Sequence, residues 1–155
     1  MIRMIDMHQD INYWTTLEWP AAPNFNDYNI FSEYCNGTVL LLGSTYLLLP
    51  LCTEAWDLNP KYSDPKIKNK EWLSIGQHFD TIILDGGLSF GRDFCNELVN
   101  KVLPKCNTFV ARVFLNPNWP TKYACYFPRA EELIPQPQEI KINEVYSFYI
   151  WQKQS

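Results

Sequence analysis

The stretch that decides the fold is NGTVLLLGSTYLLLPLCTEAWDLNP, residues 36–60. Its apolar run is broken by Gly43-Ser44-Thr45 and by Pro50, and it leads into an isolated acid, Asp57. The run falls short of the roughly 20 residues that a membrane-spanning helix needs, and Pro50 argues against a hairpin of two regular strands. We interpret the stretch as a buried strand over Val39–Leu42, a glycine turn, a short helix over Thr45–Leu51 and a second strand over Glu54–Asp57.

The rest of the chain continues the alternation of strands and helices. Apolar residues at helical spacing predict an amphipathic helix over residues 91–103, ended by Pro104. The other expected elements are a short helix over Tyr28–Tyr34, strands over Thr81–Leu84 and Thr108–Leu115, and one or two strands within Glu139–Gln152. Residues 58–71 and 116–138 are expected to be irregular. This order predicts an α/β fold, with a mostly parallel sheet and helices on its faces.

Composition narrows the class of protein. The chain has 155 residues, the size of one domain, and its 17 acidic and 13 basic residues give a net charge of −4. Because no cluster of basic residues is present, we expect no nucleic-acid partner. The five cysteines are odd in number and lack CxxC spacing, which indicates reduced thiols. With no signal-peptide pattern at the start, we expect a cytoplasmic protein that has no membrane partner.

Polar features follow three of the predicted strands, at the edge where open parallel sheets bind ligands. They are Gly43-Ser44-Thr45, Asp57 and Asp85-Gly86-Gly87. An acid after the second strand can accept both hydroxyls of a ribose, and a glycine after the first lets a ligand approach the backbone. The GxGxxG and GxxxxGK[ST] phosphate-binding motifs are absent. An adenosine-containing ligand without phosphates, such as S-adenosylmethionine, therefore fits better than a dinucleotide.

The order of these motifs resembles class I S-adenosylmethionine-dependent methyltransferases. VLLLGSTYLLLPLCTEAWDLNP is similar to that family's first strand, glycine loop and acidic second strand, and FDTIILDGGLSF is similar to its fourth-strand motif. NELVNKVLPKCNTFVARVF resembles the helix and strand that follow, over a match of roughly residues 14–115. The resemblance implies a Rossmann-like, mostly parallel sheet with helices on both faces and a last, antiparallel strand at YSFYIW.

The resemblance also implies roles for matching positions. Asp57 would bind the ribose hydroxyls, and Gly43, Ser44 and Thr45 would line the methionine moiety. The remaining positions are Trp72, a candidate stacking surface for adenine, and Asp85 and Leu88, which would face the sulfonium and the methyl acceptor. We divide the single domain, 1–155, into an N-terminal segment over the site (1–37), a cofactor-binding core (38–115), and a loop with terminal strands (116–155).

The sequence departs from the family at two places. Leu40-Leu41-Leu42 stands where the family usually has an acid, and only about fourteen residues separate Asp57 from Trp72, so the second helix and third strand are compressed or missing. Residues 1–35, the 116–138 loop or a second subunit, either another copy or a larger protein, could then supply substrate recognition. No His, Cys, Asp and Glu grouping has the spacing of a metal site, and no catalytic base is identified.

The sequence therefore predicts a methyltransferase that uses S-adenosylmethionine, with S-adenosylhomocysteine as product, and acts on a small molecule. Three alternatives remain open. The domain could be a catalytically degenerate binding or scaffold subunit, which the shortened middle and the missing first acid would favour. It could use S-adenosylmethionine in another way, such as cleaving it. A nicotinamide enzyme is the most distant alternative.

Overall fold

The computed structural model describes residues 25–58, 60, 63–86, 88, 91–115 and 128–153. Within these ranges, seven strands form one sheet in the order β3-β2-β1-β4-β5-β7-β6. The strands are β1 (Val39–Leu42), β2 (Glu54–Trp56), β3 (Ile67–Lys68), β4 (Thr81–Asp85), β5 (Thr108–Phe114), β6 (Gln138–Lys141) and β7 (Tyr146–Gln152). β1 to β5 pair in parallel, and β7 is antiparallel to both β5 and β6. The predicted parallel sheet with a C-terminal antiparallel strand is confirmed.

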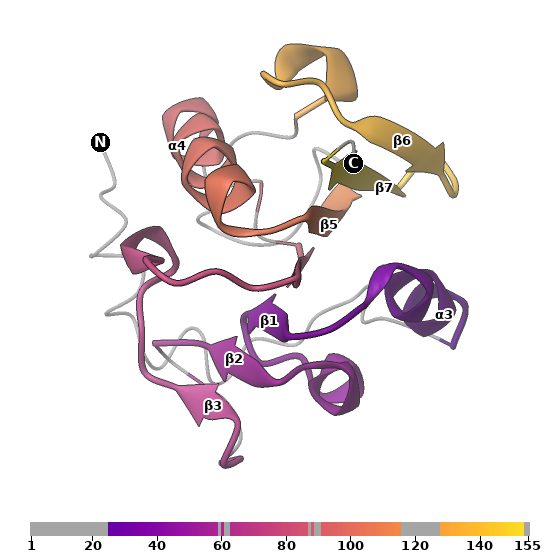
Figure 1. Cartoon of the computed structure of the whole chain (residues 1–155). Helices are drawn as coiled ribbons and strands as arrows, with labels where there is room; N and C mark the ends of the chain where they lie inside the picture. Colours follow the sequence, from indigo (N-terminus) through magenta and orange to yellow (C-terminus); the bar gives the residue numbers. More distant parts are fainter. Residues whose placement is uncertain are drawn as a thin grey trace.

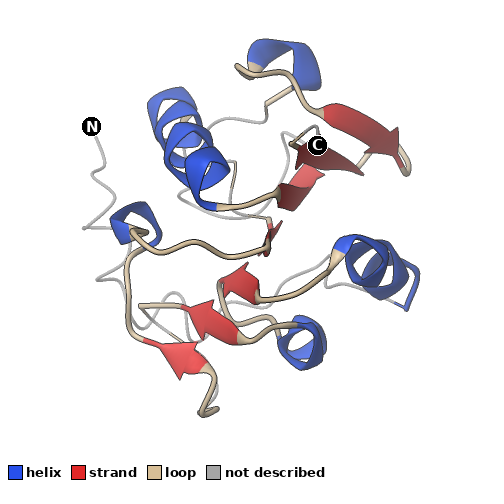
Figure 2. Cartoon of the chain, viewed as in Figure 1, coloured by secondary structure: helices blue, strands red, loops and turns tan. Residues whose placement is uncertain are grey.

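Helices cover both faces of the sheet, as the sequence predicted. Figure 1 shows α4 (Arg92–Val102) on one side of the strands and α3 (Phe25–Tyr34) on the other. The other helical segments are single turns or short 3₁₀ helices: η1 (Tyr46–Leu51), η2 (Trp72–Ser74), η3 (Leu103–Lys105) and η4 (Ala130–Glu132). Figure 2 shows how small these segments are beside α3 and α4. The helix expected over Thr45–Leu51 is thus present as a 3₁₀ helix with Pro50 inside it.

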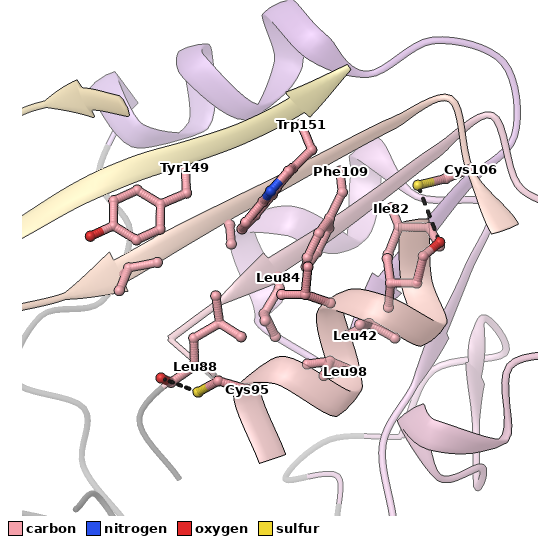
Figure 3. Close-up of a cluster of buried hydrophobic side chains, with 14 of the residues drawn as sticks. Leu42, Ile82, Leu84, Leu88, Cys95, Leu98, Cys106, Phe109, Tyr149 and Trp151 are labelled. Atoms are coloured by element: carbon pink, nitrogen blue, oxygen red, sulfur yellow. Dashed lines mark hydrogen bonds between the residues drawn. The ribbon is translucent and has the colours of Figure 1, made fainter. Parts of the chain in front are cut away.

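The apolar strands alternate between two hydrophobic cores. In β1, Leu40 and Leu42 pack in the core beneath α4, whereas Val39 and Leu41 pack in the core beneath α3 and η1. All four side chains are at most 4% exposed, because helices cover the strand on both sides. This explains why VLLL reads as one continuous apolar run. The α4 core is closed by stacking of Phe109 on Trp151, with ring centroids 5.1 Å apart (Figure 3).

Two predictions about irregular segments are wrong in part. The 58–71 segment contains β3, a two-residue edge strand that pairs with Ala55 and Trp56 of β2. The 116–138 segment contains η4, and β6 begins at its last residue, Gln138. Both elements are too short to show periodicity, and tertiary pairing forms them. The earlier helix begins at Phe25, three residues before the predicted start, and residues 1–24 of the predicted N-terminal segment lie outside the described residues.

Candidate functional site

The carboxyl ends of β1, β2 and β4 meet where the strand order reverses. β1 pairs with β2 on one side and with β4 on the other, while β3 extends one flank of the sheet and β5 the other. This is the switch point at which open parallel sheets bind ligands. The structure therefore places the loop that follows β1 between the ends of β2 and β4, as the sequence predicted.

Gly43 turns the chain out of β1 and leaves space above its backbone. Its φ of +119° is a conformation that side-chain-bearing residues rarely adopt. Its N–H donates to the carbonyl of Trp56 at 2.8 Å, which ties the turn to the end of β2. A methyl group placed at Gly43 would have its nearest neighbour, the Trp72 ring, at 4.0 Å. A ligand could therefore contact the backbone here.

Ser44 connects this loop to the acid at the end of β2. The Ser44 hydroxyl donates to Asp57 Oδ2 at 2.6 Å, and Asp57 itself is half-buried directly after β2. Thr45 ends the loop, and its carbonyl accepts from the N–H of Leu48 in η1 at 3.0 Å. The loop thus brings Ser44, Thr45 and Asp57 together beside Gly43.

Trp72 lies beside the same turn. It begins η2, is half-buried, and its indole N–H donates to the carbonyl of Trp56 at 2.8 Å. The ring also approaches Phe94 of α4, with centroids 6.5 Å apart. Since the Trp56 carbonyl accepts from both Gly43 and Trp72, one peptide group fixes the indole relative to the glycine turn. The placement suits a stacking surface.

Asp85, the last residue of β4, is buried in an ion-pair network. Its side chain is 8% exposed, and Oδ1 accepts from Arg112 Nε at 2.5 Å. Burial raises the pKa of the Asp85 carboxyl, and the neighbouring Arg112 charge opposes that rise. Arg112 Nη1 also donates to Asp27 Oδ2 at 2.8 Å, and the Tyr146 hydroxyl donates to Asp27 Oδ1 at 3.0 Å. The contact of Asp85 with a ligand stays a prediction.

Leu88 packs as a core residue. Its side chain is 1% exposed within the core beneath α4, and its carbonyl accepts from the Cys95 thiol at 2.7 Å (Figure 3). Trp72 packs against the same core, and the contact of Leu88 with a methyl acceptor stays a prediction.

Arg112 and Asp27 were not predicted as site residues from the sequence. Arg112 is 2% exposed and Asp27 is 1% exposed. One signal was available, because a charged residue inside the apolar strand TFVARVF needs a buried partner. Asp27 carried no such signal, since an acid in the first turn of a helix is an ordinary surface feature.

A hollow lies along the same edge of the sheet, farther from the switch point. Its volume is about 330 Å³, and it is bordered by the residue after β5, Leu115, and by the last residue of β6, Lys141. Its other lining residues are Arg129, Ala130, Glu131, Glu139, Asn143, Glu144 and Tyr149. Its lining combines apolar and aromatic side chains with charged side chains of both signs.

Three further properties concern the described residues. No group of three or more His, Cys, Asp or Glu is arranged to hold a metal ion in this part of the chain. None of the helices described is long and apolar enough to cross a membrane. Cys35, Cys52, Cys95 and Cys106 are free thiols, as predicted, and burial raises the pKa of Cys106 to about 12.

No protein-family model matches the sequence, and no curated protein matches it. Solved structures do match. TehB from Haemophilus influenzae superposes with a TM-score of 0.61 at 11% identity, over 93% of this chain and 67% of TehB. Human N-acetylserotonin methyltransferase in complex with S-adenosylmethionine gives a TM-score of 0.58 at 14% identity, over 83% of this chain and 50% of the human protein.

Magnesium protoporphyrin IX methyltransferase from Synechocystis PCC 6803, with bound S-adenosylmethionine, gives a TM-score of 0.55 at 9% identity over 97% of this chain and 84% of that one. The chain has the class I methyltransferase fold. At these identities the likeness establishes the methyltransferase fold alone, and activity must be argued from the site.

Proposed function

We propose that the protein is an S-adenosylmethionine-dependent methyltransferase acting on a small molecule. The observation that carries the proposal is the cluster around Gly43, in which Ser44 joins Asp57 at 2.6 Å and the Trp72 ring lies 4.0 Å from the position of a Gly43 methyl group. A carboxylate for a ribose, an open backbone turn and an aromatic ring meet at one switch point. Two of the matching structures are methyltransferases with bound S-adenosylmethionine, which supports the choice of ligand.

The residues present fit this cofactor. Asp57 would accept the two ribose hydroxyls, Trp72 would stack on adenine, and the open backbone from Gly43 to Thr45 would receive the methionine end. When bound, S-adenosylmethionine supplies a methyl group on a cationic sulfur. The chain's own contribution is to hold the ligand in one orientation and to exclude water, since positioning can supply much of the acceleration of a displacement. We assign no catalytic base.

The acceptor is proposed to be small because of the hollow beside β5 and β6. Its volume of about 330 Å³ is near the lower end of the range for small-molecule pockets. It opens on the same edge of the sheet as the Gly43 cluster, because β5 and β6 run in the same direction as β1. The free thiols support a cytoplasmic location.

One observation favours a second candidate, a binding subunit that has lost catalysis. The two acids at the switch point already accept hydrogen bonds, Asp57 from Ser44 and Asp85 from Arg112. His78 is exposed and precedes β4, at the opposite edge of the sheet. If the carboxyl edge of the sheet binds the cofactor without catalysing transfer, the protein would bind S-adenosylmethionine and S-adenosylhomocysteine and would methylate no acceptor.

Calorimetric titration with S-adenosylmethionine, S-adenosylhomocysteine and NAD tests the proposal. We expect the native protein to bind the first two and not NAD, and Asp57→Ala to lose at least about tenfold in affinity. Asp64→Ala is the matched control, because Asp64 caps a turn before β3 through its bond to the N–H of Lys66. Absence of binding by the native protein at millimolar ligand, or NAD binding in its place, would sink the proposal.

A further inference from the structure

Strand β6 ends the sheet on the side away from β3, and most of its side chains are exposed. Among the described residues it pairs only with β7, and Figure 1 shows it at the outer end of the sheet, beside β7. Gln138, Glu139 and Lys141 are exposed, and Ile140 is half-buried. An edge strand presents backbone N–H and C=O groups with which a further strand can pair. β6 is therefore a candidate surface for a partner that adds a strand.

The side chains of β6 divide between the two faces of the sheet, because successive residues of a strand point to opposite faces. Glu139 pairs with Tyr149, which packs in the core beneath α4, so Glu139 and Lys141 lie on the α4 face. Ile140 pairs with Phe148 and packs against the core beneath α3. An acid and a base thus share one face of the edge strand, and an apolar residue lies between them on the other face.

This pattern is complementary to itself when two copies of β6 run antiparallel about a twofold axis. Residues directly opposite each other then lie on the same face, so the axis passes through a residue position and not between two. An axis at Glu139 or at Lys141 would place two like charges against each other. Of the four positions in β6, only an axis at Ile140 places each Glu139 opposite Lys141 of the other copy. It also brings the two Ile140 side chains together on the α3 face.

Exposed apolar side chains flank the same strand in sequence. Ile134 precedes β6 and is 77% exposed, whereas Ile142 and Val145 follow it and are each 38% exposed. They are three of the five large apolar side chains that are exposed in the described part of the chain. Single exposed apolar residues are ordinary, but a concentration of them is typical of a surface that another chain covers. The apolar flanks and the charge pattern of β6 therefore indicate the same edge.

We propose that β6 is the interface of a homodimer, in which two copies of the strand pair antiparallel about an axis at Ile140 and join their sheets into one. The interface reaches the hollow, because Glu139 and Lys141 also line it. Each copy would then border the hollow of the other with the same two side chains. The inference concerns assembly and uses no residue assigned to S-adenosylmethionine, so it can fail while the proposed function stands.

Sedimentation equilibrium of the full chain, across a micromolar range of concentrations, tests the interface. We expect the native protein to form a dimer that dissociates on dilution. Lys141→Glu and Glu139→Lys each place two pairs of like charges in the interface, and each should raise the Kd of the dimer at least about tenfold. An equal mixture of these two variants restores both pairs of opposite charges, so it should form heterodimers with about the native Kd.

The matched control is Lys68→Glu, which makes the same change of charge at an exposed position of β3, the strand at the other edge of the sheet. Its dimer Kd should equal that of the native protein. A native protein that stays monomeric at every concentration would overturn the inference, including one whose β6 pairs with a different protein. Single variants that dimerise as well as the native protein, or a mixture of the two that does not associate, would also overturn it.

Discussion

The two ends of β4 carry acids in opposite settings. Before the strand, Asp80 accepts from the N–H and the hydroxyl of Thr38 at 2.8 and 3.1 Å, in contact with solvent. At its end, Asp85 is buried and held by Arg112. The Asp80 side chain accepts hydrogen bonds only from Thr38 among the described residues, and its carbonyl accepts from the N–H groups of Asn107 and Thr108 at the start of β5. The Asp85 network instead reaches α3, β5 and β7. The amino edge therefore joins neighbouring strands through exposed polar groups, while the carboxyl edge concentrates buried charged groups that tie the sheet to α3.

The largest effect is expected from removing the cation of the carboxyl-edge network. Arg112→Met retains much of the side-chain volume but leaves two buried carboxyl groups without the guanidinium, so we expect a loss of about 3–5 kcal/mol in the free energy of unfolding. Urea denaturation at neutral pH measures it. Lys101→Met is the control, since Lys101 forms an exposed pair with Glu97 at 3.7 Å and should change stability by at most about 1 kcal/mol. Equal losses in the two variants would contradict the account.

The glycines that precede and follow β1 should separate stability from binding. Gly37 has φ +65°, and a methyl group there would lie 2.0 Å from Asp80 Oδ2. Gly37→Ala should therefore cost at least about 1–2 kcal/mol of stability while S-adenosylmethionine affinity is retained. Gly43→Ala strains the turn and fills the space above it, so it should weaken binding by at least about tenfold. Denaturation and calorimetry on both variants check this, and a reversed pattern would refute it.

The smallest effect, and the one most specific to the comparison, is on pH dependence. Burial raises the pKa of Asp85, whereas the bonds from Thr38 lower the pKa of Asp80. A carboxyl group with a raised pKa stabilises the fold below its unfolded value of about 4, and the contribution fades as pH rises through the folded pKa. A lowered pKa does the reverse, so the contribution of Asp80 is present above about pH 4 and is lost as pH falls through its folded pKa.

Replacing Asp85 or Asp80 by Asn removes the contribution of that carboxyl group to the pH dependence of stability. As pH rises from about 3 to 7, the free energy of unfolding of Asp85→Asn should therefore increase relative to that of the native protein. The free energy of unfolding of Asp80→Asn should decrease relative to it over the same range. Thermal or urea unfolding across this range gives both differences. Parallel pH trends in the two variants would show that the two acids do not differ as described.

The sequence predicted the carboxyl edge better than the network beneath it. Gly43 and Asp57 could be placed because a buried strand followed by glycine, and a second strand followed by an acid, are local patterns that fix their position on a parallel sheet. The two residues of β3 could not be predicted, because an edge strand this short forms only by pairing with β2. The Asp27–Arg112 contact spans 85 residues, and only tertiary structure brings it together.

The most direct test of the ligand edge is a pair of amide NMR spectra of the protein with and without S-adenosylmethionine. The account predicts shifts concentrated at Gly43, Ser44, Thr45, Asp57 and Gly86, with little change at Gly37, Thr38 and Asp80, which mark the amino edge of the same strands. Shifts concentrated at the amino edge, or no shifts at saturating ligand, would contradict the claim that the carboxyl edge of the sheet is the cofactor site.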